Sequence, residues 1–137
     1  MFNFEKLEVW HRAIEFADLV YQVTRGFPDE RFGLTNQMRR AAVSISSNLA
    51  EGCSRASKQD FGRFVEIATG SAFEVVSQSV IARRQGFLAE DLQQQIYKAA
   101  EELSRMLSGL KRSLLPEYGR LRKRGSQLSA LNSQLFQ

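Results

Sequence analysis

The sequence predicts an all-α fold, an antiparallel up-down four-helix bundle. Four long segments repeat apolar residues every three or four positions, which is the spacing of one face of an α-helix. The chain has only two prolines, Pro28 and Pro116, so long helices are possible between them. No segment shows the alternation that is typical of a β-strand. Four amphipathic helices with short connections favour the up-down arrangement.

The first two predicted helices span residues 3–25 and 35–53. Asn3 is the expected N-cap of the first helix, and Gly26 with Pro28 ends its pattern. The first helix carries two apolar stripes. One stripe is Leu7, Trp10, Ile14, Ala17 and Tyr21. The other stripe is Val9, Ala13, Phe16, Val20 and Val23. The apolar face of the second helix is Leu34, Met38, Ala41, Ala42, Ile45 and Leu49.

The third predicted helix begins after Ser57, the expected N-cap, with Asp60 three residues later. Its apolar arc covers about half of the circumference, so burial on more than one side is expected. Gly70 and Ser71 lie inside it. A glycine there costs about 1 kcal/mol relative to alanine, so close packing is the expected reason for Gly70.

The fourth predicted helix spans residues 90–115 and comes close to a coiled-coil repeat. Its stripe is Leu92, Ile96, Ala99, Leu103, Met106, Leu110 and Leu114. Residues 1–115 are therefore predicted to form the bundle. Residues 116–137 form a basic C-terminal tail, either flexible or a short additional helix.

Composition and charge indicate a folded protein with one basic region. Hydrophobic residues make up 43% and charged residues 25% of the 137 residues, which is ordinary for a globular chain. The net charge is +4. Residues 105–124 hold seven basic residues and one acidic residue, so the remainder of the chain is slightly acidic.

We expect a cytoplasmic protein without a membrane segment. No apolar run approaches the roughly 18 residues of a transmembrane helix, and the N-terminus lacks the layout of a signal peptide. Cys53 is the single cysteine, which excludes an internal disulfide and is compatible with a reducing compartment.

The second predicted helix carries many small residues and a polar row. The polar row is Gln37, Ser44, Asn48, Glu51 and Arg55, and the small-residue side is Val43, Ser46, Ser47 and Ala50. Small side chains let a second helix approach closely. Two interpretations remain open. The row lies at an interface with another copy of the chain, or it packs within one bundle with Asn48 capping the chain after the helix.

Specific residues of the second and third predicted helices resemble a known family. The matching residues are Leu34, Thr35, Gln37, Arg39, Arg40, Ala41, Ser44, Ile45, Asn48, Ala50, Glu51, Gly52, Ala68, Gly70, Ser71 and Glu74. The segment 4–21 also resembles the first helix of that family. The pattern is similar to the four-helix-bundle proteins related to those encoded in intervening sequences of bacterial 23S rRNA, and it covers residues 4–114.

The resemblance implies a homopentamer of four-helix bundles with a basic outer or mouth surface. The pattern is also similar to the accessory protein of diversity-generating retroelements, which works with a reverse transcriptase and binds nucleic acid. For most members of the family no biochemical activity is established. With the resemblance, the candidate interface or structural polar residues are Arg40, Ser44, Asn48, Glu51, Gly70 and Ser71.

Catalytic chemistry is sparsely represented, so no catalytic residue, metal ligand or cofactor is predicted. His11 is the only histidine and has no second imidazole to share a metal. The carboxylates lack the Glu-x-x-His pairs of di-iron bundles. Cys53 is either a reactive thiol or, more commonly, a small packed hydrophobe. A metal-dependent nuclease is the remote third hypothesis.

Basic residues are the main candidates for a binding function. The predicted nucleic-acid contacts are Arg39, Arg55, Lys58, Arg63, Arg83, Arg84, Lys111, Arg112, Arg120, Arg122, Lys123 and Arg124. Cations at a helix C-terminus also have a purely structural explanation, and basic tails are often solubilising. Arg40 is expected to form an ion pair with Glu51 or with an acid on another helix.

The leading hypothesis is a non-enzymatic homo-oligomer that binds RNA or DNA through phosphates, with little base readout. Repetition of the basic tail around an oligomer would multiply the local charge. The alternative is an oligomeric scaffold that binds a partner protein such as a nucleic-acid enzyme. That alternative predicts an exposed apolar patch and weak nucleic-acid affinity.

Overall fold

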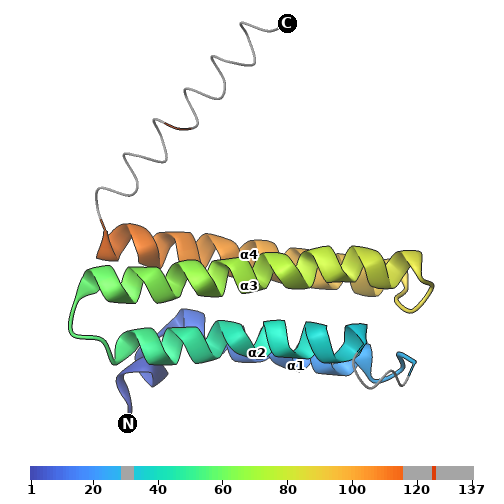
Figure 1. Cartoon of the computed structure of the whole chain (residues 1–137), viewed down its shortest axis with the longest axis horizontal. Helices are drawn as coiled ribbons and strands as arrows, with labels where there is room; N and C mark the ends of the chain where they lie inside the picture. Colours follow the sequence, from blue (N-terminus) through green and yellow to red (C-terminus); the bar gives the residue numbers. More distant parts are fainter. Residues whose placement is uncertain (29–32, 116–124, 126–137) are drawn as a thin grey trace, which may run out of the picture.

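The computed structural model describes residues 1–28, 33–115 and 125, and it shows four α-helices. They are α1 (Glu8–Thr24), α2 (Leu34–Cys53), α3 (Lys58–Arg84) and α4 (Glu90–Leu114). Successive helices run in opposite directions, and the N-terminus lies at the same end of the bundle as the last turn of α4 (Figure 1). Each helix packs against two neighbours, α1 and α3 both contacting α2 and α4. The predicted all-α four-helix bundle is confirmed.

The first predicted helix is divided into two pieces. A short 3-10 helix, η1 (Asn3–Lys6), precedes α1, and Leu7 between them has extended backbone angles. The prediction that Asn3 caps one continuous helix is wrong. Glu5 accepts a hydrogen bond from the Phe2 amide at 3.0 Å, and the Phe4 ring packs 5.1 Å from Trp10. These contacts stabilise η1 against the side of α1.

The core settles which of the two apolar stripes of α1 faces inward. The buried stripe is Val9, Ala13, Phe16 and Val20, whereas Ile14 and Tyr21 of the other stripe are exposed. On α2 the predicted face is buried except for the half-buried Leu34. The other helices complete the core with Val65, Ala68, Ala72, Val75, Ala82, Ile96, Ala100, Leu103 and Leu107.

The ends of α3 follow local sequence signals. The Ser57 side chain accepts a hydrogen bond from the Asp60 amide at 3.1 Å, which confirms the predicted N-cap. At the other end Gly86 has a φ of 79°, a left-handed conformation that glycine adopts readily. The turn then places Phe87 5.8 Å from Phe27, so aromatic packing covers this end of the core.

Candidate nucleic-acid interface

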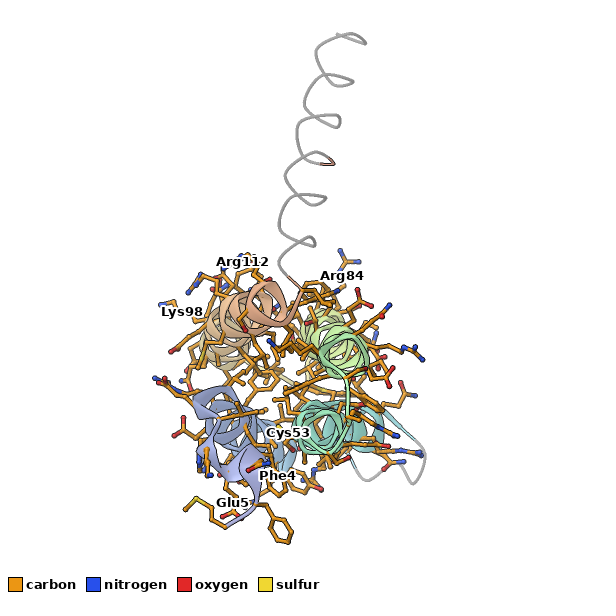
Figure 2. All side chains as sticks on the ribbon, turned by 90° about the vertical axis from the view of Figure 1, so that its left-hand side faces the viewer. Phe4, Glu5, Cys53, Arg84, Lys98 and Arg112 are labelled. Carbon is orange, nitrogen blue, oxygen red and sulfur yellow. The ribbon has the colours of Figure 1, made fainter. Side chains whose placement is uncertain are left out.

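The predicted basic residues divide between the two ends of the bundle. Arg55, Lys58 and Arg63 lie at the α2–α3 turn, and Arg112 lies in the last turn of α4 at the same end (Figure 1). Arg83 and Arg84 lie at the opposite end, in the last turn of α3. Figure 2 views the bundle from the end that carries the α2–α3 turn, with Arg112 extending outward from α4. Residues Arg120, Arg122, Lys123 and Arg124 lie outside the described residues.

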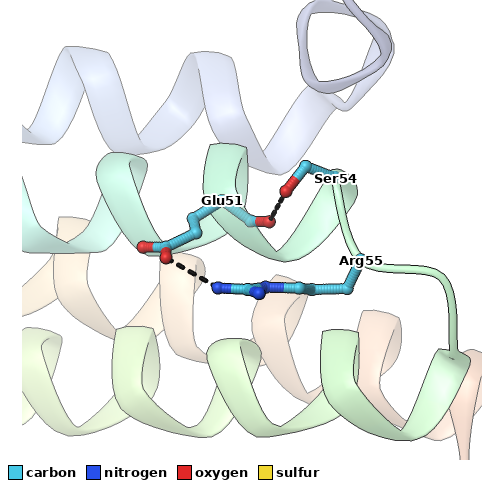
Figure 3. Close-up of polar contacts among 3 residues, drawn as sticks. All are labelled: Glu51, Ser54 and Arg55. Carbon is cyan, nitrogen blue, oxygen red and sulfur yellow. Dashed lines mark hydrogen bonds and ion pairs between the residues drawn. The ribbon is translucent and has the colours of Figure 1, made fainter.

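Arg55 is held by its own helix end. Its guanidinium lies 2.8 Å from Glu51 and 4.7 Å from the centre of the Phe64 ring. Ser54 adds a hydrogen bond to the Glu51 carbonyl at 2.6 Å (Figure 3). Both charged side chains remain about half exposed, so the pair adds little stability in water. Its main effect is to orient Arg55 at the α2–α3 turn.

Two of the predicted cations at this end have no ion-pair partner among the described residues. Arg63 lies 3.6 Å from Asp60, whereas Lys58 and Arg112 are exposed and make no ion pair with any residue that the structure describes. Their charges are therefore available to an anionic ligand.

At the opposite end, one of the two arginines is paired. Arg83 donates to Gln93 at 3.1 Å and lies 3.3 Å from Glu90. Arg84 is exposed and makes no ion pair within the described part of the chain. Of the two predicted arginines at this end, only Arg84 is thus available to a ligand, and Arg25 just after α1 is a further exposed cation without an ion pair among the described residues.

Lys111 corrects the predicted set of phosphate contacts. It is only 4% exposed, because it continues the buried stripe of Leu103 and Leu107 by one helical turn. Its ammonium contacts Glu66 of α3. A buried ammonium cannot reach a phosphate backbone, so Lys111 has a structural role.

Arg39 is likewise used inside the bundle. It donates to the Thr24 hydroxyl at 2.9 Å, and its guanidinium lies 4.5 Å from the centre of the Tyr21 ring. These contacts join α2 to α1. The geometry therefore gives no support to the predicted phosphate contact of Arg39.

The polar row of α2 faces α3 within the same chain. Ser71 donates to the Ser44 hydroxyl at 3.0 Å, and Asn48 donates to the same hydroxyl at 2.9 Å. Asn48 also donates to the Ser44 carbonyl at 2.7 Å, so it does not cap the chain after α2. This network is a junction between helices of one bundle.

Arg40 and Gly70 differ from their predicted structural roles. Arg40 is exposed and makes no ion pair with a described residue, since Glu51 pairs with Arg55. A Cβ at Gly70 would have no atom within 4 Å among the described residues. Close packing inside the chain therefore does not explain this glycine.

Two grooves flank α3. The α2–α3 groove has a volume of about 460 Å³ and is lined by polar residues that include Arg40, Glu74 and Gln78. The α3–α4 groove has a volume of about 330 Å³ and is mainly apolar. Its wall includes Phe73, which is 60% exposed, and Tyr97, which is 47% exposed. The sequence patterns did not single out Gln78, although it lies one turn after Glu74 on the side that faces α2.

The remaining reactive groups to place are the thiol of Cys53 and the metal-ligating side chains. Cys53 is half-buried, and burial raises the pKa of its thiol. A raised thiol pKa lowers the thiolate fraction, which is the nucleophilic form. No three His, Cys, Asp or Glu side chains of the described residues form a group that could hold a metal ion. Among the described helices, none is long and apolar enough to span a membrane.

The fold and its exposed cations define a helical-bundle protein with a basic end. The chain belongs to the 23S rRNA-intervening sequence protein family, whose model matches residues 5–109. Its structure is similar to a crystal structure of a protein with unknown function from the S23 ribosomal protein family of Bacteroides thetaiotaomicron. That likeness has a TM-score of 0.69 and 22% sequence identity, and it covers 76% of this chain and 98% of the other. At this identity it shows the fold alone. No curated protein matches the chain.

Proposed function

We propose that this protein is a non-enzymatic, homo-oligomeric bundle of the cytoplasm that binds nucleic acid, preferentially RNA, through its phosphate backbone. The observation that carries the proposal is the pair of available cations, Lys58 and Arg112, at one end of the bundle. They lie at the end where α4 leads into residues 116–124, which contain four basic residues and one acidic residue. Adjacent cations attract polyanions and release their counterions.

Local pairing supports the assignment of the binding end. At this end, Glu51, Asp60 and Glu66 each pair with one cation. The charges of these pairs therefore largely cancel, which leaves Lys58 and Arg112 as positive charge unpaired among the described residues, next to the basic sequence that follows α4. The N-terminal segment at the same end adds Lys6 but also the carboxylates Glu5 and Glu8. Binding of this kind depends on charge and shape rather than on base sequence.

Assembly would strengthen such binding. The family resemblance leads us to propose a pentamer, in which each copy contributes the same basic end. Several weak phosphate contacts then act together, because binding by one copy raises the effective concentration of the next. A ring of basic ends would also raise the local potential that attracts RNA.

The proposal is tested by equilibrium binding to a labelled RNA hairpin and a matched DNA duplex across a salt series. Full-length protein is compared with a chain ending at Leu115, which keeps the described core, and with Lys58→Ala/Arg112→Ala. Each lost phosphate contact should reduce the magnitude of the negative slope of log affinity against log salt by roughly 0.7 to 0.9. Arg84→Ala removes an exposed arginine at the opposite end and should change binding less. Absence of binding to both nucleic acids at low salt would contradict the proposal.

A second candidate is an oligomeric scaffold that presents a repeated surface to a partner protein such as a nucleic-acid enzyme. The apolar α3–α4 groove favours it, because Phe73 and Tyr97 expose large apolar surface beside each other. A partner protein would occupy this groove in the scaffold candidate, whereas our leading proposal assigns the groove to another copy of the chain. Phe73→Ser/Tyr97→Ser should then lower the mass measured by light scattering while RNA binding by each copy persists. An unchanged mass would contradict that assignment.

A further inference from the structure

The α2–α3 groove carries two opposite charges that do not neutralise each other. Arg40 lies on the α2 wall and Glu74 on the α3 wall, and both side chains are exposed. Within the described residues, neither makes an ion pair at 4.0 Å or less. By contrast, Arg39 of the same helix and Arg55 just after its end have defined partners. The groove therefore offers one anion-binding group and one carboxylate to a ligand.

Gln78 adds a second acceptor on the same wall as Glu74. It lies four residues later on α3, and residues at this spacing are neighbours on a helix surface. Its side-chain oxygen is buried and accepts no hydrogen bond from the described residues. A buried acceptor without a donor is unfavourable. The α3 wall is thus suited to a ligand that brings several hydrogen-bond donors.

The hydroxyls of the groove are already organised by the protein. Ser71 donates to Ser44, which also accepts from Asn48. These bonds connect the two walls within the chain. The volume of about 460 Å³ falls within the range of small-molecule and cofactor sites, so a nucleotide-sized ligand has room between Arg40 and Glu74.

We propose that the α2–α3 groove binds an unpaired guanine of single-stranded RNA, with Glu74 and Gln78 on its Watson–Crick edge and Arg40 on a neighbouring phosphate. The inference rests on the proposed nucleic-acid binding and adds a base preference to it. An ionised carboxylate only accepts hydrogen bonds. Guanine offers adjacent N1–H and N2–H₂ donors, and the second hydrogen of N2 remains for the Gln78 oxygen once that side chain turns from its buried position toward the groove.

The other bases suit the same wall less well. Adenine and cytosine each present an amino group beside a ring-nitrogen acceptor, and uracil presents one N–H between two carbonyls. In each case a lone pair of the base would face an oxygen of Glu74. A continuous phosphate backbone would also be repelled by Glu74. Bases of single-stranded RNA are commonly recognised on their Watson–Crick edges, so the chemistry of this wall selects guanine.

The test uses full-length protein and labelled single-stranded pentanucleotides that contain only adenosine or one central guanosine. A bidentate base contact should make the guanosine oligonucleotide bind about tenfold more tightly. An inosine at the same position lacks the N2 amino group and should bind with intermediate affinity. Glu74→Gln should reduce the ratio of guanosine to adenosine affinity to about one. Arg40→Gln should weaken both oligonucleotides and leave their ratio unchanged.

Glu51→Gln is the matched control, because Glu51 is an exposed carboxylate that pairs with Arg55 outside the groove. It should leave the affinity ratio unchanged. Equal affinity for guanosine and adenosine would overturn the groove proposal, whether or not another copy covers the groove. The proposed phosphate binding would still stand. Loss of all RNA binding at low salt would overturn both proposals. If Glu74→Gln did not fold, the guanosine, inosine and adenosine series on the unmodified chain would decide.

Discussion

The two long sides of α3 differ in chemistry, although both pack against neighbours in one bundle. The side facing α2 meets Gly52 and forms the Ser71–Ser44 hydrogen bond, and its groove is polar. The side facing α4 presents Phe73 to an apolar groove and contributes Glu66 to the Lys111 ion pair. One helix can therefore present a polar surface and an apolar surface that do not compete for the same ligand.

The largest effect is expected from filling the close approach between α2 and α3. A Cβ at Gly52 would lie 2.9 Å from the Phe64 Cβ and 2.9 Å from a ring carbon of Phe61. Gly52→Val should lower the free energy of unfolding by about 3 kcal/mol, because overpacking forces neighbouring groups to move. Urea denaturation measures the change. Gly26→Val is the control, since a Cβ there has no described atom within 4 Å. Equal effects of both substitutions would contradict the close approach.

A smaller effect is expected from breaking the ion pair on the α4 side. Glu66→Gln should lower the free energy of unfolding by about 1–3 kcal/mol, because the buried Lys111 ammonium loses its carboxylate. Lys111→Met should cost less, since Glu66 is 57% exposed and water can solvate its charge. Thermal and urea denaturation of both variants provide the comparison. A larger loss for Lys111→Met would show that the lysine stem, rather than the charge pair, supplies the stability.

A substitution on the outward surface of α3, between these two sides, should raise the free energy of unfolding rather than lower it. Gly70→Ala should raise the stability of a single bundle by up to about 1 kcal/mol, because alanine favours the helix and has open space here. Denaturation at a dilution that favours single copies measures this gain. Gly70→Leu, by contrast, should lower the mass of the assembled protein if another copy packs on this glycine. An unchanged mass would remove Gly70 from the interface that the family resemblance implies.

Cys53 provides the smallest and most local test, at the C-terminal end of α2. Burial raises the pKa of its thiol, so iodoacetamide should react more slowly than with a free cysteine at neutral pH. The rate should increase as the pH rises through the folded pKa, because only the thiolate reacts. Gly52→Val should accelerate the reaction by opening this end of α2, whereas Glu66→Gln should not. Fast reaction of the unmodified protein at neutral pH would contradict the raised pKa.

Sequence patterns predicted the helices well where the controlling signals are local. The predicted spans of the second and fourth helices differ from α2 and α4 by one residue at one end. The predicted N-cap of α3 is also confirmed, because the Ser57 hydroxyl accepts a hydrogen bond from the Asp60 amide. Local signals were insufficient at the N-terminus, because η1 depends on the contact between Phe4 and Trp10. Either apolar stripe of α1 could have faced the core, and only packing of the whole bundle decides between them.

The candidate site was less predictable, since it depends on which helices become neighbours. The cluster of cations near the end of α4 predicted that Lys111 and Arg112 both contact phosphates, but Lys111 follows Leu103 and Leu107 on the buried stripe. That spacing was the available signal for its burial. The ion pair between Arg55 and Glu51 could also have been predicted, because side chains four residues apart at a helix end are neighbours. The grooves lined by Glu74 and by Tyr97 could not be predicted. Each groove forms between two helices, and the sequence does not show which helices become neighbours.

The even number of helices has a mechanical consequence. Because η1 and the last turn of α4 lie at the same end of the bundle (Figure 1), a force applied between Met1 and Leu115 would pull α1 and α4 away from each other at that end. These two helices are direct neighbours, so their contacts would break one turn at a time rather than all together in shear. The bundle should therefore yield at low force when pulled by its ends, and resist more strongly when the same force is applied across opposite ends of one helix pair.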